Sequence, residues 1–249
     1  MTRAAGAPTG SSSDSGSLIG DYFRESELPL TSLVFLLPQM VVYEVGTRFL
    51  TTAARHGYQE QIIAFNITQR LCALLGLHAQ HIPALVVTAI LLAWHAASKA
   101  KWQIHAGTVI GMAVESAALA LPLILLSREA ARYFPLAATS DGTRDGIIMA
   151  LGAGVYEELV FRLMLLTALS IILREPLRHH PFWSSLGIVC ISAFAFSGYH
   201  YLSPIEYFTW RSFAFRTVAG AYFAALFLLR GFGITSGCHA AYDILILVF

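Results

Sequence analysis

Charged residues and cysteines are both scarce in this sequence, and each scarcity excludes a class of protein. Asp, Glu, Lys and Arg make up 12% of the 249 residues, and the formal net charge is +1. The 16 lysines and arginines are scattered along the chain, so the basic patch that a nucleic-acid-binding protein needs is missing. Cys72, Cys190 and Cys238 lie in apolar segments without CxxC spacing, which argues against a disulfide framework and a cysteine-based zinc site.

Apolar residues dominate the composition instead. Hydrophobic residues reach 56% of the chain and the mean hydropathy is +0.63, both far from the values of soluble proteins. This composition predicts an all-α, polytopic transmembrane helical bundle, and therefore an integral, multi-pass membrane protein. We expect it to lie in a bacterial inner membrane. Alternate loops carry nearly equal numbers of Lys and Arg, so the sequence does not fix the orientation.

Long apolar runs predict where the helices lie. Crossing a bilayer takes about 20 mostly apolar residues. Such runs occupy residues 28–46, 82–97, 104–127, 146–173, 182–201, 213–229 and 234–249. Residues 59–77 are more polar, with apolar residues at helical spacing, and indicate an amphipathic helix at the membrane interface or, alternatively, a tilted or half span. The bundle is therefore expected to have seven or eight helices.

Two segments outside these runs have their own patterns. Residues 1–20 are small, polar and low in complexity, so we expect a disordered N-terminal tail followed by a transmembrane helical domain over residues 21–249. The tail lacks the pattern of a removable signal peptide. The short basic turn at 98–103 predicts that the runs on either side of it form a helical hairpin.

The run at 146–173 contains three ionisable residues close together. Each would cost on the order of 3 kcal/mol or more near the bilayer centre, so their presence needs a reason. Glu158 and Arg162 are four residues apart on one helical face, which suits a buried ion pair. Glu157 points about 100° away. The residues on its own face are small, so we expect this face to pack against another helix: Gly146, Ala150, Ala153 and Gly154.

Two later runs carry histidines in matching positions. Phe196 and His200 are four residues apart in FAFSGYH, and His239 and Asp243 are four apart in GCHAAYD. Each pair alone can be a structural hydrogen bond between helices, and Glu158 with Arg162 can be a plain salt bridge. Burying all of these ionisable side chains separately in the membrane would cost free energy several times over, unless they contact one another. We therefore expect the ionisable residues of three helices to converge inside the bundle.

Two buried carboxylates and two buried imidazoles support activation of water. The sequence contains no serine or cysteine nucleophile elbow and no glycine-rich phosphate loop. A buried glutamate can take a proton from water, and an imidazole can share that water. A second imidazole can donate to the oxyanion of a tetrahedral intermediate. This chemistry is amide hydrolysis within a membrane.

The three motifs resemble those of the CAAX-protease and bacteriocin-processing (CPBP, or Abi) family. EELVFR at 157–162 resembles the EExxxR motif, 196–200 the FxxxH motif and 239–243 the final Hxxx(D/N) motif, in the same order, with a catalytic core over about residues 105–249. The resemblance implies an intramembrane endopeptidase in which Glu157 and His200 activate water. It further implies that His239 and Asp243 form the oxyanion site, with Glu158, Arg162 and Phe196 in support. The implied partners are the lipid bilayer and a protein or peptide substrate with a membrane-associated tail.

The role of Asp243 and the metal content are separate questions. An ionised Asp243 would repel an oxyanion, so it either is protonated or, as we prefer, orients His239 as an acceptor. Members of the family have been described both as metalloproteases and as metal-independent glutamate proteases. The HExxH zinc motif is absent, so we expect no metal cofactor. Zinc held by Glu157, His200, His239 and Asp243 is the alternative.

Two other classes of protein would also bury such residues. A proton-coupled or ion-coupled transporter places Glu, His and Asp within its spans, but the sequence shows no paired repeats. A non-catalytic membrane scaffold could keep the same fold for binding a partner. Without a soluble recognition domain, substrate specificity is expected to come from the cavity and from the loop at 202–211.

Overall fold

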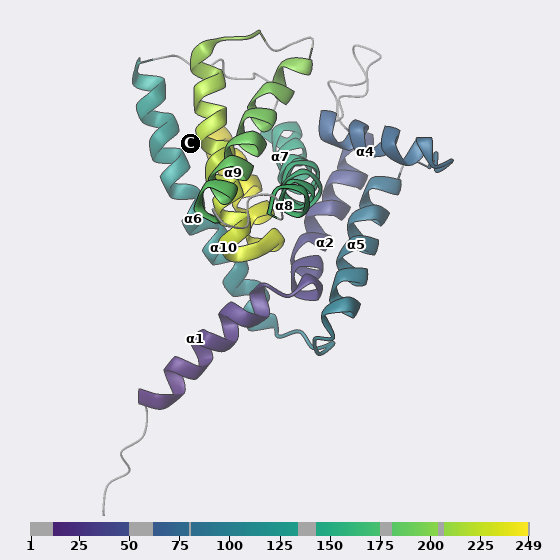
Figure 1. The fold of residues 1–249 in the computed structure, drawn as a ribbon, viewed down its shortest axis with the longest axis vertical. Helices are drawn as coiled ribbons and strands as arrows, with labels where there is room; N and C mark the ends of the chain where they lie inside the picture. The colour runs from purple at the N-terminus through teal and green to yellow at the C-terminus, as the bar shows by residue number, and fades with distance from the viewer. Residues whose placement is uncertain are drawn as a thin grey trace, which may run out of the picture.

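A computed structural model describes residues 12–49, 62–79, 81–133, 143–174, 181–203 and 207–248 (Figure 1). Within these ranges the chain is helical and contains no strand, which confirms the predicted all-α class. The elements are α1 (Ser12–Ser26), α2 (Pro29–Gly46), η1 (Thr47–Phe49), α4 (Ile63–Leu74), α5 (Ile82–Ser98), α6 (Ala106–Tyr133), α7 (Thr143–Glu158), η2 (Leu159–Leu166), α8 (Thr167–Arg174), α9 (Pro181–Tyr199), η3 (His200–Leu202) and α10 (Trp210–Val248). All eight segments predicted from the sequence contain helix.

Several helices are long and apolar enough to cross a membrane. In the described part of the chain these are Pro29–Phe49, Ala106–Glu129, Phe182–Leu202 and Trp210–Val248, and α5 is a shorter apolar helix. Large apolar side chains project outward from them, including Val114, Leu125 and Leu229, which are 66%, 65% and 72% exposed. Such a surface suits lipid and not water. The protein is an integral membrane protein built as a helical bundle.

Helix α10 consists of two arms that fold back on each other. Gly231 has φ 74° and ψ −174°, a conformation that favours glycine, and it interrupts the helix. The rings of Phe223 and His239, eight residues on either side of Gly231, stack with centroids 4.5 Å apart. Sixteen residues of straight helix would separate them by about 24 Å. The two spans expected at 213–229 and 234–249 are therefore confirmed as an antiparallel pair.

The reversal at Gly231 is stabilised by a partly buried polar cluster. Arg230 Nε donates to Glu115 Oε1 across 2.7 Å, and its other nitrogens donate to Glu27 Oε1 and Ser26 Oγ, each across 2.8 Å. The Tyr22 hydroxyl also donates to Glu115. Glu115, an acidic residue inside an apolar span, is thus explained by this cluster, which ties α10 to α6 and to the end of α1.

The N-terminal prediction needs a correction. We expected residues 1–20 to be a disordered tail. Residues 1–11 lie outside the described part of the chain, but α1 begins at Ser12. The helix is held at its C-terminal end by the contacts of Tyr22 and Ser26 with the cluster around Arg230, which composition alone does not reveal.

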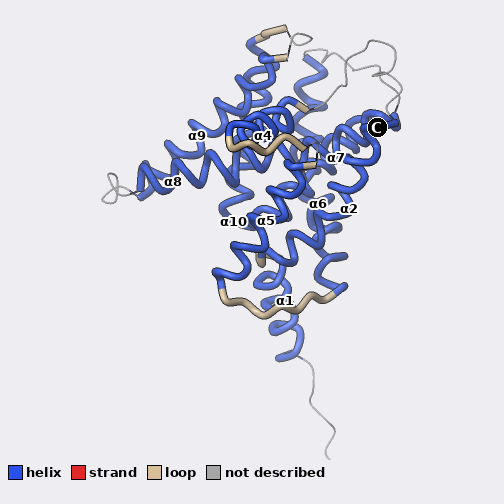
Figure 2. Tube along the Cα trace, turned by 90° about the vertical axis from the view of Figure 1, so that its right-hand side faces the viewer, coloured by secondary structure: helices blue, strands red, loops and turns tan. Residues whose placement is uncertain are grey.

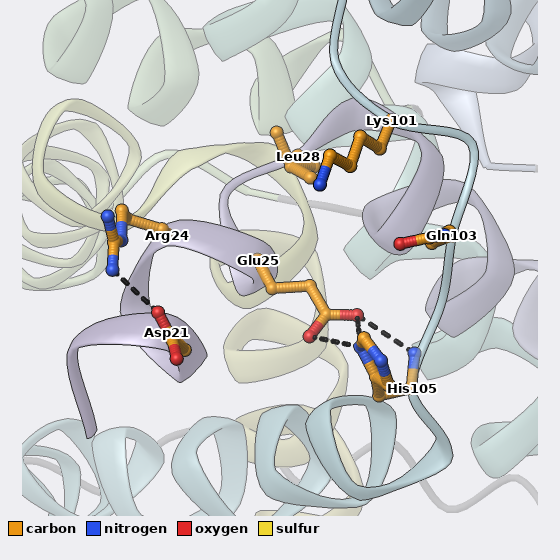
Figure 3. Close-up of a pocket in the computed structure, with 7 residues that line it drawn as sticks. All are labelled: Asp21, Arg24, Glu25, Leu28, Lys101, Gln103 and His105. Atoms are coloured by element: carbon orange, nitrogen blue, oxygen red, sulfur yellow. Dashed lines mark hydrogen bonds and ion pairs between the residues drawn. The ribbon is translucent and has the colours of Figure 1, made fainter. Parts of the chain in front are cut away.

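Helices α5 and α6 are consecutive but do not form the expected hairpin. Helix α5 packs against α2, and α6 packs mainly against α10. Their connection, residues 99–105, crosses the lower end of the bundle (Figures 1 and 2). Glu25 holds this connection in place by accepting hydrogen bonds from the His105 backbone N–H and Nδ1, both across 2.8 Å (Figure 3). An open cleft of about 280 Å³ lies between α1 and the connection, away from the polar residues of the expected site.

Helix α4 is too short to be a span. Its 12 residues extend about 18 Å, whereas the hydrocarbon core is about 30 Å thick. It runs across the ends of α2 and α5 in Figure 1. This geometry favours the interfacial helix that we expected within residues 59–77. Its inward side chains, such as Phe65, contact Tyr43 and Tyr156 in the main core.

The segment expected as one helix over 146–173 is divided into three elements. Helix α7 ends at Glu158, the π-helix η2 follows, and α8 continues in another direction. Helix α8 is seen end-on in Figure 1 and extends sideways in Figure 2. In a π-helix each backbone carbonyl accepts from the N–H five residues on, and not from the one four residues on. The Phe161 carbonyl also accepts from the Ser192 hydroxyl of α9 across 3.0 Å, which links this irregular segment to a neighbouring helix.

Candidate active site inside the bundle

The ion pair expected between Glu158 and Arg162 is present and fully buried. Arg162 Nε lies 3.0 Å from Glu158 Oε2, and both side chains are 0% exposed. The guanidinium also donates to the Gly220 carbonyl across 3.0 Å and lies 4.5 Å from the centre of the Phe196 ring. A buried charge of this kind needs such partners, because desolvation costs several kcal/mol per ion.

Glu158 also contacts a histidine from the C-terminal arm of α10. Glu158 Oε1 lies 2.7 Å from His239 Nδ1. Because a carboxylate oxygen accepts, Nδ1 is the donor, and Arg162, Glu158 and His239 form a continuous buried chain. We expected Asp243 to orient His239, but Asp243 Oδ2 is 3.6 Å from Nε2, on the other side of the ring. The orienting acceptor is therefore Glu158, a role that the sequence did not indicate.

Glu157 faces both histidines. Its Oε2 lies 3.8 Å from His200 Nε2 and 3.9 Å from His239 Nε2. These distances exceed those of direct hydrogen bonds, and they suit groups that share one small molecule between them. The predicted convergence of ionisable residues from α7, the end of α9 and α10 is thus observed.

His200 is held so that Nε2 points into this space. Its Nδ1 donates to the Phe196 carbonyl across 2.8 Å, because a carbonyl can only accept. A neutral His200 then has an acceptor at Nε2 facing Glu157. The Phe196 ring packs edge-on against the His200 ring, with centroids 4.9 Å apart. Phe196 therefore contacts both His200 and Arg162.

His239 is held by a second aromatic residue. Its ring stacks on Phe223 with 18° between the planes, while Nδ1 donates to Glu158. Both histidines thus use Nδ1 as an anchor and present Nε2 to Glu157. Phe223 was not among the residues expected at the site, since only the reversal at Gly231 brings it beside His239.

The small residues on the Glu157 face allow close helix packing, as expected. A side chain added at Gly154 would place Cβ 2.7 Å from both the Ser236 carbonyl oxygen and Ala240 Cβ. Helix α7 therefore approaches the second arm of α10 closely, near His239. This contact is what carries Glu157 into the bundle, where the residue is 7% exposed.

The site is closed on one side and open on the other. The side chains of Glu157 and His239 are 9% and 6% exposed, whereas those of His200 and Asp243 are 20% and 32% exposed. His200 and Asp243 therefore form the more exposed edge of this cluster.

Glu157, His200, His239 and Asp243 are also the candidate ligands of a metal ion. Two imidazoles and two carboxylates are chemically suitable zinc ligands. In the described part of the chain, however, no three or more His, Cys, Asp and Glu side chains are arranged to hold a metal ion. His179 and His180, which we expected to be interfacial and not ligands, lie outside the described residues.

The part of the chain that contains these residues is similar to a known protein family. Residues 141–245 match the family of Rce1-like proteins, described as type II CAAX prenyl endopeptidases. No curated protein and no solved structure matches the chain significantly. The matched residues include all seven candidates: Glu157, Glu158, Arg162, Phe196, His200, His239 and Asp243. This match to residues 141–245 confirms the resemblance seen in the three motifs.

Proposed function

We propose that the protein is an intramembrane endopeptidase that hydrolyses a peptide bond near the membrane-associated tail of a protein substrate. The observation that carries this proposal is the arrangement of Glu157 Oε2 opposite the Nε2 atoms of His200 and His239, at 3.8 and 3.9 Å. The family match supports protease activity in general. The roles of individual residues are our inference.

Hydrolysis begins with a water molecule between Glu157 and His200. Glu157 Oε2 accepts one proton from this water, and His200 Nε2 accepts a hydrogen bond from its second O–H. The water oxygen attacks the carbonyl carbon of the scissile peptide bond, and the carbonyl oxygen becomes an oxyanion. Burial of Glu157 excludes bulk water, so the activated water is the one positioned between the two residues.

His239 stabilises the oxyanion. A protonated imidazole donates through both nitrogens, so His239 can keep Nδ1 on Glu158 while Nε2 donates to the oxyanion. Asp243 Oδ2, 3.6 Å from Nε2, is the nearest acceptor for this second N–H before substrate binds. Collapse of the intermediate breaks the C–N bond. The proton held by Glu157 passes to the leaving nitrogen, which releases an amine and a carboxylic acid and restores Glu157.

Exposed aromatic residues at the start of α10 support a substrate with a membrane-associated tail. Tyr207, just before α10, and Trp210, its first residue, are 85% and 76% exposed. Aromatic residues of this kind favour the membrane–water interface. A protein whose tail is anchored in the bilayer can therefore present its peptide bond at this level, and the loop at 202–211 contributes to its selection. Localisation in a bacterial inner membrane stays a prediction.

The test is a cleavage assay with the full chain in lipid vesicles and peptides that carry a lipid-modified or apolar C-terminal tail. The parent protein should cleave at least one such peptide at an internal bond. Glu157→Ala and His200→Ala should each lower turnover by at least about 100-fold without changing yield or thermal stability. Asp21→Asn, at an exposed carboxylate, serves as the control. Substantial turnover by either alanine variant would remove the proposed mechanism.

A further inference from the structure

A tyrosine at a variable position of the FxxxH motif contacts the proposed base directly. The Tyr199 hydroxyl lies 3.2 Å from Glu157 Oε1 and 2.9 Å from the backbone nitrogen of Ala64. Tyr199 is 6% exposed, so water does not replace these partners. Its ring packs against Phe161 and His200, with centroids 4.9 and 5.0 Å away.

The two contacts fix the direction of the hydroxyl. The Ala64 N–H can only donate, so the Tyr199 oxygen accepts from it. The single hydrogen of the hydroxyl is then free to point at Glu157 Oε1. One carboxylate oxygen of Glu157 is therefore held by Tyr199, and the other, Oε2, faces both histidines. With Oε1 bound to Tyr199, Oε2 is the oxygen of Glu157 that faces the proposed water.

The donor on Ala64 comes from a part of the chain outside the matched family region. Ala64 lies in the first turn of α4, where backbone N–H groups have no partner within the helix. Two tyrosine hydroxyls accept these N–H groups: Tyr199 from Ala64, and Tyr43 from Ile62 across 3.4 Å. Helix α4 is thus fastened to the bundle by the same hydroxyl that contacts Glu157.

We propose that Tyr199 is a positioning residue, which uses the N-terminus of α4 to aim its hydroxyl at Glu157 and so leaves Oε2 of Glu157 to activate water. This proposal rests on the proposed peptidase function. It assigns α4, which lies before residues 141–245, a part in completing the site. Tyr199 itself acts through Glu157 and does not touch the substrate.

The test compares Tyr199→Phe with Tyr43→Phe in the full chain. Both substitutions remove one hydroxyl from a buried ring and one acceptor from the first turn of α4, but only Tyr199 contacts Glu157. Loss of a hydrogen bond to a charged group predicts a fall in kcat of about 10- to 100-fold for Tyr199→Phe, with KM changed less than about threefold. Tyr43→Phe should stay within about threefold of the parent in both constants.

A second measurement does not depend on catalysis. The infrared band of the Glu157 carboxyl group is isolated by subtracting the spectrum of Glu157→Gln. Tyr199→Phe should shift this band, and Tyr43→Phe should leave it in place. A shifted band in a protein without peptidase activity would overturn the proposed function and keep the positioning role. Equal losses of kcat in both variants, or an unshifted band in Tyr199→Phe, would overturn the positioning role.

Discussion

Glu158 Oε1 and His239 Nδ1 lie 2.7 Å apart and join the middle of the chain to its last helical arm. The neighbouring Glu157 points instead toward the open part of the site. Two adjacent glutamates therefore differ in their surroundings. Glu158 is enclosed between a guanidinium and an imidazole, whereas Glu157 Oε2 lies 3.8 Å from His200 Nε2 and 3.9 Å from His239 Nε2. This difference leads to the first prediction.

Arg162→Ala should reduce both stability and activity. The substitution leaves the buried Glu158 carboxylate without its guanidinium partner, at a cost of about 3 to 5 kcal/mol, and loosens the anchor of His239. Yield and thermal midpoint measured in detergent check this expectation. The matched control is Arg24→Ala, which breaks an exposed ion pair with Asp21 at 2.6 Å and should cost less than about 1 kcal/mol. Equal thermal midpoints for the two variants would show that burial of the Arg162 pair has no energetic effect.

Asp243→Asn should retain activity within about tenfold of the parent, whereas Asp243→Ala should lose at least about 100-fold. Asparagine keeps the shape of the side chain and can accept from His239 or donate to an oxyanion, but it carries no charge. The measurement is kcat/KM for the parent and both variants across a range of pH with one peptide. If Asn is as inactive as Ala at every pH, the negative charge itself is required, and Asp243 becomes a candidate metal ligand.

Chelation should leave peptidase activity unchanged. This prediction rests on the missing HExxH motif and on the use of His239 Nδ1 by Glu158. Metal analysis of the purified, active protein should give well under one zinc per chain. Stoichiometric zinc, with activity lost to a chelator and recovered on adding zinc, would assign Glu157, His200, His239 and Asp243 to a metal centre.

Glu25→Gln should weaken the protein at neutral pH more than at acidic pH. Burial alone would raise the pKa of Glu25, but hydrogen bonds from Thr108 and His105 outweigh it and hold the pKa below its ordinary value of 4.5. A carboxylate with a lowered pKa stabilises the folded state above its unfolded pKa and loses this effect as pH falls through the folded pKa. The thermal midpoints of parent and variant should therefore differ above about pH 5 and converge below about pH 4. A difference that is constant with pH would assign the effect to shape alone.

The sequence was sufficient for the helical class and for the convergence of the three motifs. Buried charge in lipid is so costly that Glu157, His200 and His239 had to meet, and periodicity placed each on its helix. The pairing of Glu158 with Arg162 was also predictable, since both residues lie within one turn. These conclusions depend on local spacing and on general energetics.

Contacts between distant segments were not predictable in the same way. Nothing in the apolar run after Glu158 marks it as a π-helix, and its link to α9 through Phe161 and Ser192 joins residues 31 positions apart. The hydrogen bond between His239 and Glu158 depends on how closely α7 approaches α10 at Gly154. The hairpin expected from α5 and α6 was wrong because α5 packs better against α2 than against its neighbour in sequence.

Because α10 reverses at Gly231, three segments lie at one end of the bundle, and the side of the membrane that this end faces determines the orientation of the whole protein. Arg230 is bonded to Ser26 and Glu27, and Glu25 is bonded to His105. The end of α1, the connection 99–105 and the corner at Gly231 therefore lie at the same end of the bundle, while both arms of α10 point away from it. One accessibility measurement on a cysteine introduced at Lys101 would assign all three segments to the same compartment, and the Trp210 end of α10 to the opposite one.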